Sequence, residues 1–237
     1  NYKVVGFTNE IEVSEMAKIA KRNKVPLVVD AGSGCITKFE KFEMPKEKLN
    51  KSYFNDGADI VMFSGDKLLG GPQCGIIAGK KKYIDMMKKN SLYRVLRADK
   101  LTFSILDSIL RKHRINSKYE PENLALYLLT RTRNEIKKSI LKLLNKIDEK
   151  IIKQYGIKII DTMVEAGSGA MPINSIKSLG ITFDNKKNSP DMLSKKFRNH
   201  STPLIGHIKG DKFIIDFKAI PDDCLDDISK IFLEVLK

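Results

Sequence analysis

The run of residues 63–75, FSGDKLLGGPQCG, constrains what this chain can fold into more than any other segment. It places one lysine, Lys67, in a polar, glycine-rich turn between apolar runs at residues 60–63 and 75–79. Upstream, an apolar run that ends at Val29 is followed at once by a carboxylate, Asp30. Both side chains are therefore predicted to lie where a strand ends and to reach into a cleft.

A strand-end aspartate followed by a strand-end lysine is the pair that pyridoxal phosphate (PLP) enzymes need. Lys67 is predicted to form the imine with the cofactor and to act as general base at the substrate Cα. Asp30 is predicted to keep the pyridine nitrogen protonated, through a charge-assisted hydrogen bond of about 1.5–3 kcal/mol. The alternatives are a solvated surface lysine and an Asx-turn aspartate that opens the glycine-rich residues 32–34.

The first half of the chain alternates between strand and helix patterns. Apolar runs of strand length occur at residues 4–7, 26–29, 60–63 and 74–78. Helical spacing occurs at residues 13–22, 80–89 and 101–114. Such alternation predicts a largely parallel sheet with right-handed crossovers, whose ligands bind beyond the carboxyl ends of the strands.

The second half shows a different pattern. Residues 124–155 are predicted to be mostly helical, with an interruption near Thr130. Short strands are predicted at residues 157–164, 173–183, 204–209 and 212–216. Two further helices are predicted at residues 191–199 and 222–236. This mixture indicates a small α+β domain.

Three sequence blocks carry a family resemblance: VVDAGSG at residues 28–34, SGDKLLGGPQ at 64–73 and SLYRVLRADKLT at 91–102. In this order and at these distances they resemble the bacterial selenocysteine synthases, the L-seryl-tRNA(Sec) selenium transferases. The resemblance extends from Asn1 to about residue 111 and resumes more weakly toward the C-terminus. Related PLP lyases also carry a Ser-Gly-x-Lys turn, but the sequence of residues 66–71, DKLLGG, and the paired arginines favour the synthase family.

The resemblance implies an α/β fold, the PLP-dependent transferase fold type I (aspartate-aminotransferase-like). Its large parallel-sheet domain has more strands than residues 1–115 supply, so we expect this chain to be the C-terminal portion of a longer protein. Three regions are then expected: the C-terminal part of the PLP-binding large domain at 1–115, a connecting helical region at 116–155, and a small α+β C-terminal domain at 156–237.

The resemblance also implies ligands for the cofactor phosphate. Ser64 has the place of a hydroxyl that contacts this phosphate in related enzymes. Gly70, Gly71 and Gln73 follow Lys67, and bare backbone there could approach a phosphate closely. Simple turn chemistry is the alternative explanation for the glycines.

Arg94 and Arg97 match the arginines that are thought to hold the selenium donor, selenophosphate, in the synthases. Their spacing would place both on one face of a helical turn. Arginine suits bidentate recognition of phosphate-like oxyanions. A solvated basic segment is the alternative, because residues 94–100 are rich in charge.

The implied activity is PLP-dependent conversion of seryl-tRNA(Sec) to selenocysteinyl-tRNA(Sec), by β-elimination to an aminoacrylate and addition of selenium from selenophosphate. The resemblance further implies a homo-oligomer with the active site at a dimer interface. One alternative is a PLP-dependent lyase or desulfurase that acts on a free amino acid without tRNA. Another is a basic, non-catalytic nucleic-acid-binding module, although the sequence has no recognisable RNA-binding motif.

Composition limits which binding partners and which cellular compartment are expected. A net charge of +14 favours polyanionic partners, or reflects a lysine-rich proteome. The 3 cysteines are widely spaced and odd in number, which predicts neither a metal site nor a disulfide framework and indicates a cytoplasmic protein. No apolar run approaches the ~20 residues that a membrane span needs, so no membrane association is expected.

Cys74 and His113 lie near these motifs but are not expected to take part in the chemistry. Cys74 follows the lysine turn and is interpreted as a small buried residue. The three histidines form no triad and no metal-binding spacing. His113 lies in a basic helix end and is expected to be solvated.

Overall fold

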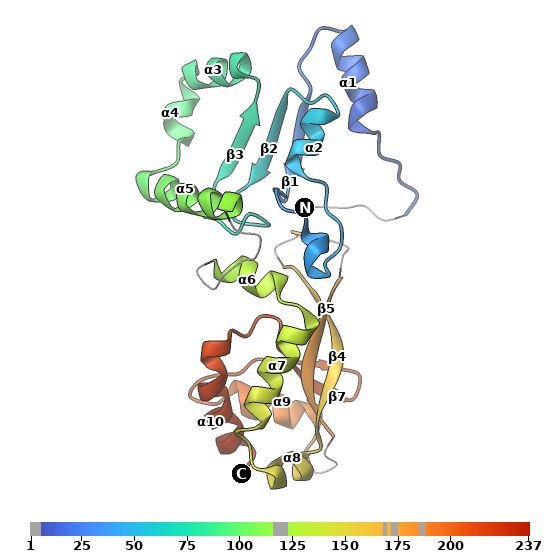
Figure 1. Cartoon of the computed structure of the whole chain (residues 1–237), viewed down its shortest axis with the longest axis vertical. Coiled ribbons are helices and arrows are strands. Elements are labelled where there is room, and N and C mark those ends of the chain that lie inside the picture. The colour runs from blue at the N-terminus through green and yellow to red at the C-terminus, as the bar shows by residue number, and fades with distance from the viewer. Residues whose placement is uncertain (1–5, 116–122, 168–169, 172–174, 185–187) are drawn as a thin grey trace. The chain divides into compact units, whose positions relative to one another are not determined.

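A computed structural model describes residues 6–115, 123–167, 170–171, 175–184 and 188–237 (Figure 1). The chain divides into two compact units. Unit 1 comprises Asn1–Tyr127 and Glu165–Asn174, and unit 2 comprises Leu128–Val164 and Ser175–Lys237. The strand predicted at residues 4–7 lies mostly outside the described residues, as does the start of the strand predicted at 173–183.

Unit 1 contains a sheet in the order β1-β2-β3, formed by β1 (Val28–Gly32), β2 (Ile60–Ser64) and β3 (Gly75–Gly79). β1 and β2 are parallel, as the alternating pattern predicts, and β2 and β3 are antiparallel. The sheet is therefore mixed. β3 reverses direction because only a short loop joins it to β2, whereas a parallel neighbour needs a crossover of a dozen residues or more.

The helical segments of unit 1 precede and follow this sheet. They are α1 (Val13–Arg22), η1 (Phe39–Phe42), α2 (Asn50–Asn55), α3 (Lys81–Lys89), α4 (Leu92–Leu96) and α5 (Lys100–Ile115). α6 (Leu124–Thr130) contains the point where the two units divide. Figure 1 shows α3, α4 and α5 following one another beside β3. The buried side chains of unit 1 include Phe39, Val61 and Leu126.

Unit 2 is an α+β unit, as its sequence pattern predicts. Its helices are α7 (Arg133–Leu144), α8 (Glu149–Tyr155), α9 (Pro190–Arg198), η2 (Asp222–Cys224) and α10 (Leu225–Val235). Its strands are β4 (Ile157–Glu165), β5 (Ser175–Phe183), β6 (His207–Lys209) and β7 (Lys212–Asp216), in the order β4-β5-β7-β6. β7 is antiparallel to both β5 and β6.

Local sequence explains where the helices of unit 2 begin. Thr132 and Glu135 form a capping box at the start of α7, each side chain bonding the other residue's backbone N–H. This cap confirms the interruption predicted near Thr130. Ser189 caps α9 through the N–H of Met192, and Pro190 occupies the first turn, where its missing N–H costs nothing.

Aromatic packing holds the helices of unit 2 to its sheet. Phe183 of β5, Phe197 of α9, Phe213 of β7 and Phe232 of α10 form one cluster, with centroids of contacting rings 5.2 to 5.9 Å apart. Offset ring pairs at such separations stabilise a core beyond the area that they bury. The cluster therefore ties four elements together.

A buried cation, Arg131, lies just before α7 and is 3% exposed. Its guanidinium donates to the carbonyl of Phe217 at 3.2 Å and to the carboxylate of Asp222 at 3.1 Å. The buried amine of Lys218 donates in turn to the carbonyl of Arg131 at 2.6 Å. These bonds join the start of α7 to the segment that follows β7.

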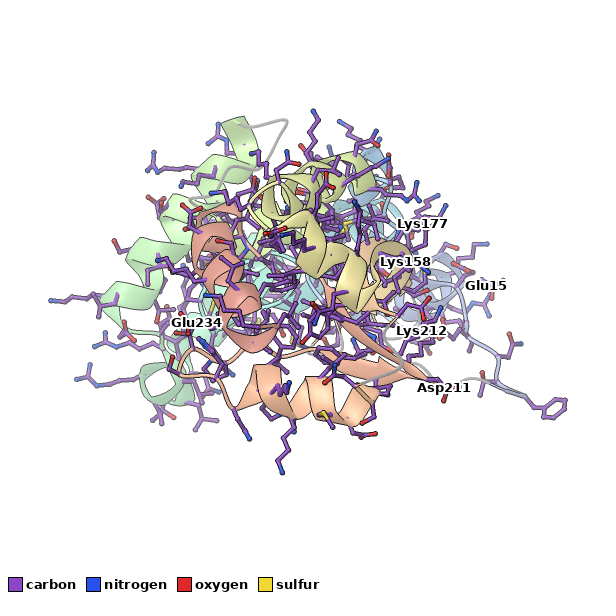
Figure 2. All side chains as sticks on the ribbon, turned by 90° about the horizontal axis from the view of Figure 1, so that it is seen from below. Glu15, Lys158, Lys177, Asp211, Lys212 and Glu234 are labelled. Carbon is purple, nitrogen blue, oxygen red and sulfur yellow. The ribbon has the colours of Figure 1, made fainter. Side chains whose placement is uncertain are left out.

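Charged side chains cover the outside of unit 2. Figure 2 labels Lys158, Lys177 and Lys212, exposed lysines on β4, β5 and β7. It also labels Glu234, whose carboxylate lies 2.9 Å from Nε2 of His200. Within the part of the chain that the structure describes, no helix is both long and apolar enough to cross a membrane.

Candidate functional site

The candidate site lies at the carboxyl ends of β1 and β2. Because these strands are parallel, their ends meet at one edge of the sheet, with Asp30 beside Met62 and Gly32 beside Phe63. A cavity of about 670 Å³ opens at this edge. Its lining includes Asp30 and Ser64, so the structure brings these two predicted site residues together.

The Asp30 carboxylate has a local role as well. Its Oδ1 accepts a hydrogen bond from the backbone N–H of Gly32 at 3.0 Å, which is an Asx-type turn. Gly32 has a positive φ of 62°, a conformation that glycine adopts without steric cost. The turn expected as an alternative is therefore present, and the same exposed side chain still lines the cavity.

Lys67 lies in the loop between β2 and β3, and backbone hydrogen bonds hold this loop. Gly65 N–H donates to Cys74 at 2.8 Å, and Gly71 N–H donates to Gly65 at 2.8 Å. Leu68 N–H donates to the carbonyl of Ser33, in the loop after β1, at 3.1 Å. The strand ends that carry Asp30 and Ser64 and the turn that carries Lys67 therefore form one bonded assembly.

Hydrophobic burial anchors the same turn. Leu68 is 1% exposed and Leu69 is 0% exposed, whereas Lys67 before them is half-buried. Two fully buried leucines next to the lysine remove the main freedom of the turn to move away from the core. Lys67 is not among the residues that line the 670 Å³ cavity, so its role at that cavity stays a prediction.

Close packing accounts for the glycines that follow Lys67. Gly70 has a φ of +67°, and a Cβ built there would meet the side chains of Asn123 at 2.8 Å and Leu126 at 2.9 Å. A Cβ at Gly71 would lie 3.0 Å from the carbonyl oxygen of Gly65. Turn geometry and packing thus explain both glycines without a ligand. The phosphate role of Gly70, Gly71 and the exposed Gln73 stays a prediction.

The two arginines do not share one helical turn, contrary to the expectation from their spacing. Arg94 lies in α4, which ends at Leu96, and Arg97 follows as its C-cap with extended backbone, φ −66° and ψ 138°. α4 is a single short turn, so the helix stops before both arginines can lie on one face. Both side chains are exposed.

The arginine segment nevertheless borders the candidate site. Leu96, between the two arginines, lines the 670 Å³ cavity. Arg97 and Leu96 also line a neighbouring apolar groove of about 690 Å³, which is formed by β3, α3, α4 and α5. The segment therefore borders the cavity through Leu96, but the structure places neither guanidinium in the cavity lining.

His113 is the residue of this region that sequence reasoning missed. It lies on α5, yet it is half-buried, and its Nε2 lies 2.9 Å from the carbonyl oxygen of Leu69. Its Nδ1 lies 3.2 Å from the hydroxyl of Thr37. Burial lowers the pKa of His113 below its usual value of 6.5. The expectation of a solvated histidine was wrong, because 44 residues separate His113 from Leu69 and no sequence pattern links them.

The cysteines of the site region are free thiols. Cys74 is half-buried, with its Sγ packed against Gly65, and burial raises its pKa. Cys35 is buried more deeply, and burial raises its pKa to about 12. Neither thiol has the low pKa of a nucleophilic cysteine.

Comparison with known proteins decides the family. The family model described as L-seryl-tRNA selenium transferase matches residues 1–221 of this chain. The chain belongs to this family. The selenium transferase resemblance seen in the three sequence blocks is thereby confirmed over nearly the whole chain.

Curated relatives agree with the selenium transferase family. The L-seryl-tRNA(Sec) selenium transferase of Proteus mirabilis (strain HI4320) is 38% identical over 226 residues, which cover 94% of this chain and 49% of the relative. The enzyme of the same name from Clostridium botulinum (strain Loch Maree / Type A3) is 34% identical, covering 100% of this chain and 51% of the relative. The chain therefore spans about half the length of these relatives.

Solved structures agree on the fold. The structure of D-glucosaminate-6-phosphate ammonia-lyase covers 96% of this chain and 53% of its own chain, with a TM-score of 0.58 and 16% identity. A likeness at this identity shows the fold alone. It confirms the α/β, aspartate-aminotransferase-like fold that the selenium transferase resemblance implies.

Proposed function

We propose that the protein carrying this chain converts seryl-tRNA(Sec) to selenocysteinyl-tRNA(Sec), with PLP as cofactor and selenophosphate as selenium donor. The observation that carries the proposal is the match of residues 1–221 to the L-seryl-tRNA selenium transferase family. The activity is proposed for the whole protein, because this chain spans about half of its curated relatives.

The residues at the cavity fit PLP. A cavity of about 670 Å³ is within the range of small-molecule sites, roughly 300–1,000 Å³. It offers a carboxylate, Asp30, for the pyridine nitrogen and a hydroxyl, Ser64, for the phosphate. Lys67 is three residues beyond Ser64, in the adjoining turn. This donor set matches the charge and hydrogen-bonding groups of the cofactor.

We assign the proton chemistry to Lys67 and Asp30. Lys67 would hold the cofactor through its Nζ and, once released, take the proton from the serine Cα. Asp30 would hold a proton on the pyridine nitrogen, and its bond to Gly32 N–H fixes the carboxylate for that task. PLP, when bound, supplies the electron sink that makes the Cα proton acidic. Loss of the serine β-hydroxyl then leaves Cβ open to selenium.

We assign recognition of anions to Ser64, to the turn formed by Gly70, Gly71 and Gln73, and to Arg94 and Arg97. Ser64 and the turn would bind the cofactor phosphate. The two exposed arginines would bind selenophosphate, because guanidinium pairs with oxyanions through two parallel hydrogen bonds. Their segment borders the cavity through Leu96, which supports this division of roles.

We further propose a cytoplasmic homo-oligomer whose active site lies at an interface between copies. The three free thiols support a reducing compartment. Large apolar side chains on α4 and α5, among them Leu96, Leu101 and Phe103, are exposed and support association of this region with another surface.

The experiment is a single-turnover assay of the full-length protein with PLP, seryl-tRNA(Sec) and selenophosphate. We expect selenocysteinyl-tRNA(Sec) to form with wild-type protein and not with Lys67→Ala. Lys112→Ala, a change of another lysine in unit 1, is the matched control and should retain activity. Turnover of free serine or cysteine without tRNA, and none of seryl-tRNA(Sec), would overturn the proposal in favour of a lyase or desulfurase.

A further inference from the structure

Three contacts outside the cavity fix the turn that carries Lys67. Leu68 N–H is bonded to Ser33 on one side, at 3.1 Å. The carbonyl of Leu69 lies 2.9 Å from Nε2 of His113 on the other. Gly70 N–H closes the turn onto the carbonyl of Lys67 at 2.9 Å. Of these three contacts, only the one from His113 is made by a side chain, and that side chain belongs to a distant helix, α5.

The hydrogen-bond partners assign the tautomer of His113. A carbonyl oxygen can only accept, so Nε2 must carry the proton that Leu69 receives. In the neutral ring Nδ1 is then an acceptor, and the hydroxyl of Thr37 donates to it across 3.2 Å. Burial lowers the pKa of His113, which favours this neutral form at physiological pH. Both ring nitrogens are thus used, one toward the lysine turn and one toward the loop after β1.

We propose that His113 is a positioning residue for Lys67: it bonds the backbone two residues after the lysine and thereby fixes the direction of the lysine side chain. The inference rests on the proposed role of Lys67. His113 touches neither substrate nor cofactor in this scheme. It acts through the Leu69 carbonyl, and Thr37 fixes the ring.

The sequence of the turn explains why such a bond matters. Gly65, Gly70 and Gly71 surround Lys67, and glycine gives the backbone more freedom than any other residue. Removing the donor to a buried carbonyl also costs stability, because the carbonyl is left without a hydrogen bond. Without His113 the turn would therefore lose the one side-chain bond among these three contacts, and the Lys67 side chain would be positioned less exactly. Misplacement of a reacting group by about 1 Å can slow a reaction about 10²-fold.

The test measures how fast PLP becomes fixed to Lys67 of the full-length protein when borohydride is added after timed exposure to PLP. Peptide mass spectrometry locates and counts the label, and circular dichroism gives the melting temperature of each variant. His113→Phe keeps a ring but loses both hydrogen bonds. His113→Gln keeps an amide N–H that can donate to Leu69. Thr37→Val removes the hydroxyl that donates to Nδ1.

We expect labelling of Lys67 to slow about fivefold to tenfold in His113→Phe, mainly from loss of the hydrogen bond to Leu69. His113→Gln should recover at least half of the wild-type rate. Thr37→Val should slow labelling about twofold. His200→Phe is the matched control, because His200 belongs to unit 2, where it is bonded to Glu234.

Each outcome decides between positioning and simple stabilisation. Equal rates in wild type and His113→Phe, below both melting temperatures, overturn the inference. A loss of rate that only follows the unfolded fraction also overturns it. If His113→Phe does not fold, Thr37→Val decides: slower labelling at an unchanged melting temperature supports positioning, and an unchanged rate refutes it. Failure of wild-type protein to label Lys67 at all would instead refute the proposed function.

Discussion

Gly34 lies so close to the end of β2 that a Cβ on it would stand 2.7 Å from the carbonyl oxygen of Ser64. Gly34 also has a φ of +74°, where an L side chain is strained. This contact packs the loop after Asp30 against the strand end that carries Ser64. The two halves of the candidate site are therefore held together by a residue without a side chain.

Gly34→Ala should destabilise unit 1 by about 2–5 kcal/mol, as the sum of left-handed strain and overpacking. Gly210→Ala is the matched control, because Gly210 has a φ of +57° but nothing within 4 Å of the added Cβ. It should cost only the strain, about 1–2 kcal/mol. Urea denaturation measures both. An equal loss of unfolding free energy in the two variants would show that the backbone near Ser64 moves away from the added Cβ without cost.

Asp30→Asn should leave PLP able to attach to Lys67 but slow loss of the Cα proton on the order of 10²-fold or more. Asparagine retains an oxygen that can accept from Gly32 N–H, so the local turn survives and only the charge is lost. The rate of solvent deuterium exchange at the serine Cα gives the measurement. Near-normal exchange by this variant would leave Asp30 as a turn residue only.

Arg94→Ala and Arg97→Ala should raise the selenophosphate concentration needed for half-maximal rate at least about tenfold, with loss of the serine hydroxyl preserved. Arg→Lys at either position should be impaired too, because an ammonium lacks the bidentate geometry. Arg111→Ala, which removes an exposed arginine paired with Asp107 on α5, is the control. An unchanged selenophosphate dependence in both alanine variants would place the donor site elsewhere.

The His200–Glu234 pair should make the stability of unit 2 depend on pH. The hydrogen bond to Glu234 raises the pKa of His200 above 6.5. A raised folded-state pKa means that the contribution is complete below pH 6.5 and disappears as pH rises through the folded value. Glu234→Gln should therefore lose more stability at about pH 5.5 than at about pH 9, when measured by urea denaturation.

The control for this pH dependence is Asp227→Asn, which breaks the exposed pair with Lys230. This pair contains no histidine, so its effect should be the same at both pH values. A Glu234→Gln effect that is equally large at both pH values would mean that His200 does not change its charge between them.

Much of the site could be predicted because strand ends leave a clear sequence signal. Asp30 and Ser64 each follow an apolar run of strand length, and parallel pairing of those strands places them at one cavity. The predictions that were wrong concern residues whose positions depend on tertiary contacts. His113 bonds a carbonyl that no pattern marks, and Arg97 falls outside α4 because the helix ends at Leu96.

The direction of β3 shows the same limit within the fold. An apolar run of strand length predicts a strand at residues 74–78 but not which neighbour it joins or in which direction. The loop from Ser64 to Gly75 carries the chain back along β2, and the pairing of Ser64 with Gly75 makes it a hairpin-like return. The glycines of that loop serve both this reversal and the lysine turn.

The buried Arg131 has a consequence for how the chain is made. Its partners Phe217 and Asp222 lie 86 and 91 residues further along the chain, so almost all of unit 2 must be synthesised before they can bond it. Until then the guanidinium, which is deeply buried in the finished fold, stays in water. Such a long loop closes late in folding. The chain between the two residues must lose conformational entropy before the contact can stabilise it. A product that ends before residue 217 would lack both of these partners of Arg131.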